Sequence, residues 1–130
     1  MSIANGNEIF PMEDSEAWGY QVKVYLAGHS QLQIQVTNQK TGQILYINFV
    51  SVEFYDGPVD WSGKGFSIGD STECLQILKR LEPFRNDPQR ALREGYSLYV
   101  AEPENGYRVR VIAGNKPTLT EENLFAAYVP

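Results

Sequence analysis

Residues 43–55 read QILYINFVSVEFY, a stretch in which the alternation of apolar side chains changes parity. Residues 44–47 are apolar on both faces, and the alternation then changes from Leu45, Ile47 and Phe49 to Val50, Val52 and Phe54. A β-bulge adds one residue to a strand and shifts its alternation by one position. We therefore expect a strand over 43–55 with a bulge near 49–51, either central in its sheet or strongly bent.

Four further strands are expected on either side of this stretch. Apolar and polar residues alternate with a period of two over 20–26, 31–37, 96–100 and 107–111. This alternation is typical of antiparallel strands with one buried face and one face in water. Glycine, asparagine and proline residues separate the strands and favour turns, including one at 103–106.

Two helices are expected in the middle of the chain, and each has its own start signal. Asp70 is placed to cap the first helix, and Glu73 completes a capping box. Asp87 is placed to cap the second helix, with Pro88 at its first position and Gly95 just past its end. Both helices fall between the third and the fourth predicted strands.

The order of the elements predicts the fold class. Thr120 is expected to cap a short C-terminal helix, with a hydrophobic staple between Leu119 and Leu124. The order is then β-β-β-α-α-β-β-α, which indicates an α+β fold. We expect a mainly antiparallel, twisted sheet of about five strands with the helices packed on one face. Residues 1–18 are expected to form an irregular N-terminal arm, and residues 19–130 a single domain.

The composition excludes several classes of partner. The 130 residues are 42% hydrophobic, which is enough to bury the core of one domain. The net charge is −5, so the average field repels nucleic acid. No run approaches the roughly 18 apolar residues of a membrane span. We therefore expect neither nucleic acid nor a membrane as a partner.

The chain has one cysteine and one histidine. One cysteine excludes an intramolecular disulfide framework, and one histidine excludes a site with several histidine ligands. No dinucleotide, phosphate-binding or calcium-binding motif has the required spacing. We therefore expect no cofactor and no metal. Residues 1–7 lack a basic region followed by an apolar run, so a cytoplasmic location is expected.

The glycine-rich segment 56–69 is the first candidate site, and we expect it to be a loop. Loops on a rigid scaffold often carry function, and glycines allow a ligand to approach the backbone closely. Its candidate residues are two carboxylates, one cation and two aromatic rings: Asp56, Asp60, Lys64, Trp61 and Phe66. The alternative is that Trp61 and Phe66 pack against the end of the sheet.

The polar side of the predicted sheet is the second candidate surface. If all the strands share one sheet, its outward side chains are Gln21, Lys23, Gln31, Gln33, Gln35, Arg108 and Arg110, with Tyr25 and Tyr99 among them. Arg108 and Arg110 are then candidates for binding a partner or an anionic ligand. The alternative is an ordinary solvated face of a half-buried sheet.

No catalytic residue is assigned. His29 lies in a turn, and neither an orienting partner nor a nucleophile adjoins it in the sequence. Cys74 lies in the first turn of the first predicted helix, where the helix dipole lowers the pKa of a thiol. It also shares a helix face with Ile77 and Leu78, which favours packing as a small hydrophobe.

Three functions stay open at this point. The first, which the absence of catalytic motifs favours, is a small soluble non-enzymatic protein–protein interaction or regulatory module that binds a protein partner or forms a homodimer. The second is a small-ligand-binding cup at residues 56–69, in which Arg108 or Lys64 orients an anionic group. The walls of that cup would be four aromatic side chains: Tyr46, Phe49, Trp61 and Phe66. The third is an enzyme with His29 or Asp60 as its general base.

Overall fold

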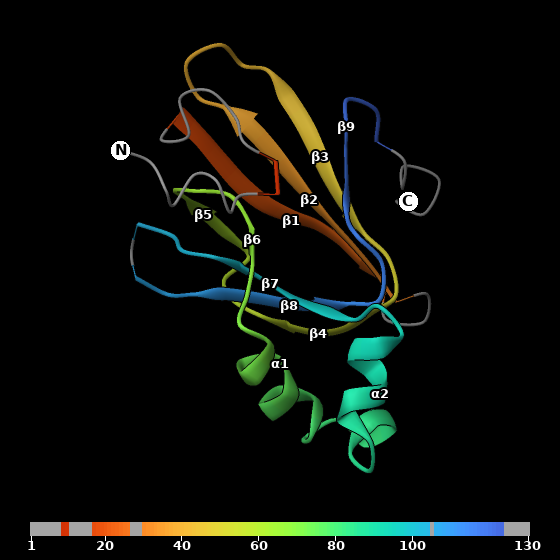
Figure 1. Ribbon diagram of the computed structural model, residues 1–130. Helices are drawn as coiled ribbons and strands as arrows, with labels where there is room; N and C mark the ends of the chain where they lie inside the picture. Colours follow the sequence, from red (N-terminus) through yellow and green to blue (C-terminus); the bar gives the residue numbers. More distant parts are fainter. Residues whose placement is uncertain (1–8, 11–16, 27–29, 105, 124–130) are drawn as a thin grey trace.

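The computed structural model describes residues 9–10, 17–26, 30–104 and 106–123 of the chain. Its strands form two antiparallel sheets that pack face to face, and both α-helices lie outside the smaller sheet (Figure 1). The antiparallel, sheet-rich character with few helices agrees with the expectation from the sequence. The expected single sheet of about five strands is wrong in detail, because the described residues form nine strands in two sheets.

The larger sheet has the strand order β5-β1-β2-β3-β9. Its strands are β1 Trp18–Leu26, β2 Gln31–Asn38, β3 Ile44–Phe49, β5 Asp60–Ser62 and β9 Thr118–Thr120. The smaller sheet has the strand order β4-β8-β7-β6. Its strands are β4 Val52–Asp56, β6 Ser67–Ile68, β7 Ser97–Ala101 and β8 Val109–Ala113.

The parity change within residues 43–55 marks a corner between the two sheets. β3 belongs to the larger sheet and β4 to the smaller one, and only Val50 and Ser51 separate them (Figure 1). Ser51 has a backbone φ of 54°, in the left-handed region. The expected strong bend is confirmed. However, the chain changes sheets here instead of forming a bulge within one strand, and a register shift follows between Val52 and Phe54.

A second corner joins β8 to β9. Residues 114–117 carry the chain from the smaller sheet back to the edge of the larger sheet. Thr120 pairs with Tyr46 of β3, so it lies in a strand and does not cap a helix. The expected helix start is therefore wrong, because pairing with β3 overrides the local capping signal. Leu124, the second half of the expected staple, lies outside the described residues.

A bulge in β1 changes which of its side chains face the core. The pairing of β1 with β2 shifts between Val22 and Val24, which leaves Lys23 as the extra residue. Beyond the bulge, Tyr25 lies opposite the buried Leu32. The sequence pattern puts Tyr25 on the polar side of the sheet instead. That expectation is wrong because uniform alternation does not hold through a bulge.

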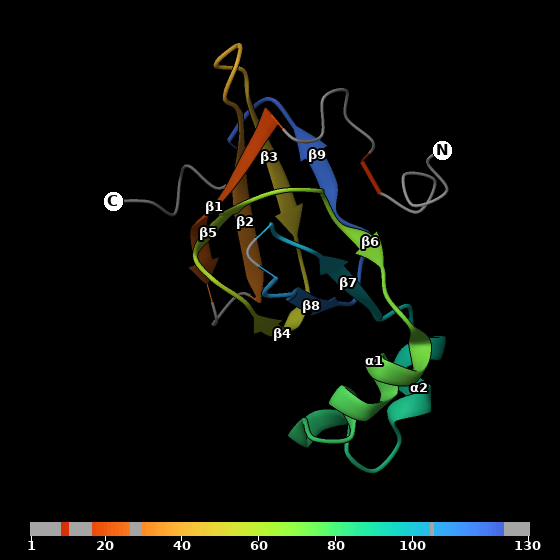
Figure 2. The ribbon, with the colours of Figure 1, turned by 90° about the vertical axis from the view of Figure 1, so that its left-hand side faces the viewer.

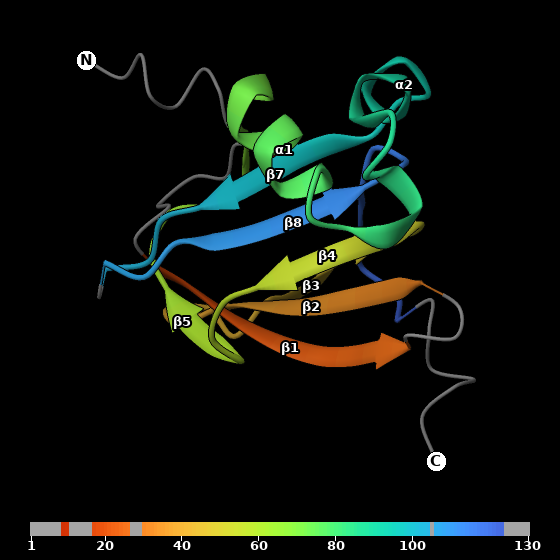
Figure 3. The same ribbon diagram turned by 90° about the horizontal axis from the view of Figure 1, so that it is seen from below.

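Two apolar cores hold the three layers together. The first lies between the sheets and includes Leu32, Phe49 and Val111. The second lies between the smaller sheet and the helices and includes Leu78 and Ile112 (Figure 3). Val111 and Ile112 are successive residues of β8, so their side chains point to opposite faces and enter different cores. The smaller sheet is therefore buried on both faces.

The two expected helices in the middle of the chain are confirmed. They are α1 Ser71–Leu78 and α2 Pro88–Arg93, with a 3-10 helix at Glu82–Phe84 between them. The Asp70 carboxylate accepts a hydrogen bond from the backbone N–H of Thr72 at 2.9 Å, and Asp87 accepts one from that of Arg90 at 3.1 Å. None of the described helices has both the length and the apolar character needed to cross a membrane.

Replacing Ser51 tests the corner between β3 and β4. A β-branched side chain disfavours a positive φ, so Ser51→Val should lower the free energy of unfolding by about 1–2 kcal/mol relative to Ser51→Gly. Both variants lose the exposed hydrogen bond from Asn115 to the Ser51 hydroxyl, so their difference reports on the backbone. Urea denaturation measures it, and equal stability of the two variants would contradict the assigned role.

Candidate functional site

Residues 56–69, which we expected to be a loop, contain two short strands. β5 pairs with β1 at the edge of the larger sheet, and β6 pairs with β7 at the edge of the smaller sheet. The segment therefore crosses from one sheet to the other (Figure 2). Gly63 lies at the crossing with a φ of 137° and forms a β-bridge with Pro103, a conformation that favours glycine.

Trp61 and Phe66, two of the predicted site residues, lie in the core between the sheets. Trp61 is 8% exposed and stacks on Tyr20, with the ring centroids 5.4 Å apart. The ring of Phe66 packs edge-on against two other rings, with centroid distances of 6.1 Å to Trp61 and 5.3 Å to Phe49. Three of the four aromatic rings expected to wall a ligand cup therefore contact one another and fill that space. This arrangement supports the packing alternative for both residues.

Removing the Trp61 ring tests this packing role. We expect Trp61→Ala to lower the free energy of unfolding by about 3–5 kcal/mol, because it leaves a cavity in the core. Val59 lies two residues earlier and is 70% exposed, so Val59→Ala should change stability by no more than about 0.5 kcal/mol. Urea denaturation followed by circular dichroism measures both. A loss below about 1 kcal/mol for Trp61→Ala would be incompatible with a core position.

Asp56, Arg108 and Arg110, three further predicted site residues, meet Glu73 of α1 in one ion-pair cluster. Arg108 donates hydrogen bonds from two nitrogens to the two carboxylate oxygens of Glu73, each at 2.9 Å. Arg110 donates to Glu73 at 3.3 Å and to Asp56 at 2.5 Å. Its guanidinium also lies over the ring of Phe54, 5.6 Å from the centroid. Two positive and two negative groups thus neutralise one another.

The cluster attaches α1 to β8. Glu73 binds the two arginines from the first turn of α1, so it does not complete the expected capping box with Asp70. Its hydrogen bonds with Arg108 lower the pKa of the Glu73 carboxyl below its ordinary value. The same bonds raise the pKa of Arg108, whereas the hydrogen bond with Asp56, followed by that with Glu73, raises the pKa of Arg110. These charges therefore hold the helix against the sheet.

The lowered pKa of Glu73 predicts a pH-dependent contribution to stability. A carboxyl whose pKa is depressed by folding stabilises the protein above its ordinary pKa, and this contribution is lost as the pH falls through the folded value. At neutral pH, Glu73→Gln should lower the free energy of unfolding by about 1 kcal/mol, since the partly exposed pair is screened by solvent. The difference from wild type should disappear under acidic conditions.

Glu82→Gln is the matched control for this comparison. The ion pair between Glu82 and Arg85 is well exposed, so its removal should change stability little. Urea denaturation at neutral and at acidic pH measures both variants. A Glu73→Gln variant as stable as wild type at neutral pH would contradict the role of the cluster.

The expected polar face is divided between two sheets. Gln21 and Gln35 lie on the larger sheet, whereas Arg108 precedes β8 and Arg110 lies within it, in the smaller sheet. Gln33 is buried and donates hydrogen bonds to Asn48 at 3.3 Å and to Asn123 at 2.7 Å, so it is not a solvated side chain. The glutamines and the two arginines therefore do not form one polar face, because their strands belong to different sheets.

The remaining reactive side chains offer little nucleophilic chemistry. Cys74 is buried beside Ile77 and Leu78, and burial together with Glu73 raises the pKa of its thiol to about 11. The thiol is therefore protonated at neutral pH, which favours the packing alternative. Lys64 is exposed, and His29 lies outside the described residues.

Exposed apolar side chains gather along one side of the molecule, which the sequence analysis did not single out. We call this surface the tyrosine edge and define it by Tyr25, Tyr55, Pro58, Val59 and Tyr107. The rings of Tyr25 and Tyr55 lie 6.5 Å apart, and the Tyr55 hydroxyl donates a hydrogen bond to the Pro58 carbonyl at 2.5 Å. Pro58 and Tyr107 line one surface hollow of about 320 Å³. The tyrosine edge is therefore a connected surface.

Two strand edges border the tyrosine edge. β4 pairs only with β8 in the described part of the chain. The pairing of β1 with β5 covers Gly19 to Gln21, and the N–H of Val22 then binds the Val59 carbonyl at 2.8 Å. Among the described residues, no strand pairs with this side of β1 beyond Val22. The sequence carries no motif for such an edge, because it results from how far β5 extends.

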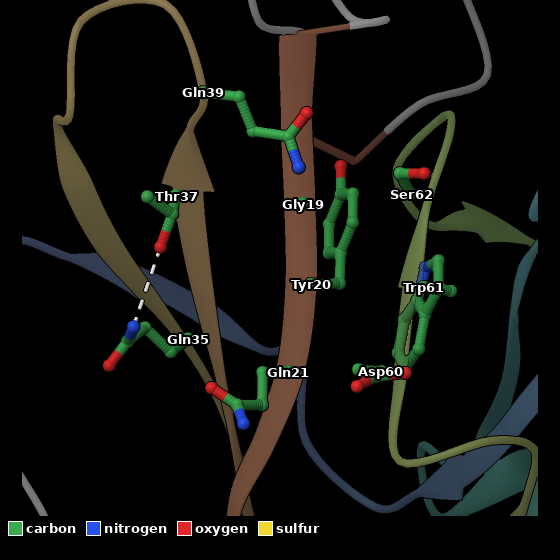
Figure 4. A pocket seen from close by; sticks show the side chains of 9 residues that line it. All are labelled: Gly19, Tyr20, Gln21, Gln35, Thr37, Gln39, Asp60, Trp61 and Ser62. Atoms are coloured by element: carbon green, nitrogen blue, oxygen red, sulfur yellow. Dashed lines mark hydrogen bonds between the residues drawn. The ribbon is translucent and has the colours of Figure 1, made fainter.

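A polar hollow of about 440 Å³ lies on the outer face of the larger sheet, over β5, β1 and β2 (Figure 4). Gly19 lies between Ser62 and Thr37 and contributes no side chain to the hollow, and the Gln39 carboxamide nitrogen reaches to 3.0 Å from where a Cβ atom of Gly19 would lie. The next row along the strands is polar: Asp60, Gln21 and Gln35. Gln39 borders the hollow on the β2 side. Of the predicted site residues, Asp60 and Trp61 line this hollow.

Comparisons of the chain with protein-family models, with curated proteins and with solved structures found no match.

Proposed function

We propose that this protein is a non-enzymatic module that binds a protein partner through the tyrosine edge. The observation that carries the proposal is the exposure of Tyr25, Val59 and Tyr107, at 48%, 70% and 72%, on one connected surface. Large apolar side chains that are exposed together mark interaction sites, whereas single ones do not. Tyrosine is enriched at protein interfaces because it offers a large contact area and loses little conformational entropy.

The open strand edges suggest how a partner binds. An unpaired strand edge presents backbone N–H and C=O groups that an additional strand can pair with. β1 beyond Val22 and the free side of β4 provide two such edges beside the tyrosines. We expect an extended segment of the partner to pair with one of them and to pack its apolar side chains against Tyr25 and Tyr55.

The state of the reactive side chains supports a binding role over a catalytic one. Asp56, Arg108 and Arg110 are engaged in ion pairs that hold α1 on the sheet. Cys74 is protonated and buried. The proposed partner surface is also separate from the hollow above Gly19, since the two share none of their defining residues.

Site-specific photo-crosslinking in cells tests the proposal. A benzophenone side chain in place of Val59 should yield a discrete crosslinked product, because Val59 belongs to the tyrosine edge and is 70% exposed. The same group in place of Ile68 is the matched control, since Ile68 is 65% exposed and lies on β6, the opposite edge of the smaller sheet. Tyr25→Ala combined with Tyr107→Ala should reduce the Val59 product about tenfold or more.

Mass spectrometry of the product separates the outcomes. A defined partner protein crosslinked at position 59 supports the proposal. A product of twice the chain mass indicates that the partner is a second copy of this chain. Equal crosslinking at positions 59 and 68, or none at position 59, would overturn the proposed binding surface.

A further inference from the structure

The hollow above Gly19 is lined by polar side chains, and Gly19 itself contributes none. Its outward-facing side chains are three carboxamides, two hydroxyls and one carboxylate: Gln21, Gln35, Gln39, Thr37, Ser62 and Asp60. The carboxamides and hydroxyls both donate and accept hydrogen bonds, whereas the carboxylate only accepts. These groups come from three adjacent strands and from the turn after β2, so they surround one space from several sides (Figure 4).

The lining excludes several classes of ligand. Among the described residues, no lysine, arginine or histidine lines the hollow, and Asp60 adds a negative charge, so the site is not matched to an anion. The rings of Tyr20 and Trp61 stack on each other within the core, so their faces do not provide a platform for a flat aromatic ligand. The hollow is therefore suited to a neutral molecule that forms many hydrogen bonds.

The backbone around the hollow also disfavours an extended peptide. Between Gly19 and Gln21, β1 pairs with β2 on one side and with β5 on the other. Its backbone N–H and C=O groups are therefore used within the sheet, and a ligand on this face meets side chains only. Recognition through a backbone ladder, as proposed for the tyrosine edge, does not apply here.

Gly19 leaves room above the sheet, and the flexible Gln39 side chain reaches into this room. Its φ is not positive, so its backbone conformation does not require glycine. A glycine within a strand weakens the strand and often marks a close approach of a ligand or another chain segment. A Cβ atom at Gly19 would meet the flexible Gln39 side chain at 3.0 Å and otherwise only the Trp61 carbonyl at 4.0 Å. A larger side chain would therefore fill the hollow without a clash against the backbone.

From these observations we infer that the hollow above Gly19 binds a neutral, hydroxyl-rich ligand, such as one sugar unit of a saccharide. The sugar hydroxyls exchange hydrogen bonds with Gln21, Gln35 and Gln39, while the flexible Gln39 side chain moves aside from Gly19 to admit the ring. This binding is independent of the tyrosine edge, since the two surfaces share none of their defining residues. A failure of one proposal therefore leaves the other standing.

Titration of the full chain with simple sugars, followed by amide NMR spectra, tests this inference. The probes are glucose, galactose, mannose and N-acetylglucosamine, each up to about 50 mM, because a single sugar unit is expected to bind in the millimolar range. We expect at least one sugar to shift the amide signals of residues 19–21, 35–37 and 60–62. Inorganic phosphate, an anionic probe, should leave these signals unchanged.

Two glycine variants keep the test independent of folding. Gly19→Val should abolish the shifts and leave the melting temperature unchanged or higher, and Gly19→Ala should weaken binding if the larger substitution fails to fold. Gln21→Ala should weaken binding about tenfold, since it removes hydrogen bonds to the ligand. Gln43→Ala, an exposed glutamine outside the hollow, is the matched control and should bind as wild type. The inference is overturned if no sugar shifts these signals, if phosphate shifts them instead, or if binding persists in Gly19→Val.

Discussion

The ring of Phe49 packs between the two sheets, and much of the structure depends on this contact. It is the last residue of β3 in the larger sheet, and its ring contacts Tyr99 of the smaller sheet at 5.6 Å. It also contacts Phe66, which in turn contacts Trp61. Because Ser51 turns the chain into the other sheet only two residues later, the ring is buried where the sheets meet. Apolar burial at this point thus determines where residues 56–69 can run.

The segment 56–69 illustrates how one strand serves packing and recognition at once. In β5, Trp61 points into the core, while Asp60 and Ser62 point to the outer face, as the period of two requires. A change at Trp61 therefore affects stability first, and a change at Gln21 or Gly19 affects the outer face without removing core packing. This separation allows the two proposed binding surfaces to be examined without loss of the fold.

Electrostatics has a mainly structural role in the described part of this acidic chain. Glu73 joins α1 to β8 through two arginines, and Arg110 extends the contact to Asp56. Charged hydrogen bonds of this kind are geometrically specific, so they position the helix as well as stabilise it. Both proposed binding surfaces instead rely mainly on uncharged groups: tyrosine rings in one, and carboxamides and hydroxyls beside the Asp60 carboxylate in the other.

Local signals in the sequence, namely helix caps and apolar alternation, predicted the two helices and the longer strands. The caps at Asp70 and Asp87 predicted both α-helices outside the smaller sheet, because a cap acts on backbone groups two or three residues away. Alternation predicted β1, β2, β7, β8 and the stretch that forms β3 and β4, because it reports one buried face. It did not predict β5, β6 and β9, which have only two or three residues each. The parity change near Phe49 located the corner, although a bulge and a change of sheet shift the alternation equally. Only the tertiary structure distinguished them.

The tertiary structure alone decided which distant residues meet. Trp61 and Phe66 were recognised as candidates, but their burial follows from the pairing of β5 with β1 and of β6 with β7. The tyrosine edge depends on the bulge at Lys23, and no residue in the sequence around it predicts a bulge there. The hollow depends on the position of Gly19 in β1, between the neighbouring strands β5 and β2. Strand pairing over long distances along the chain decides these features, and a local sequence pattern carries no information about such partners.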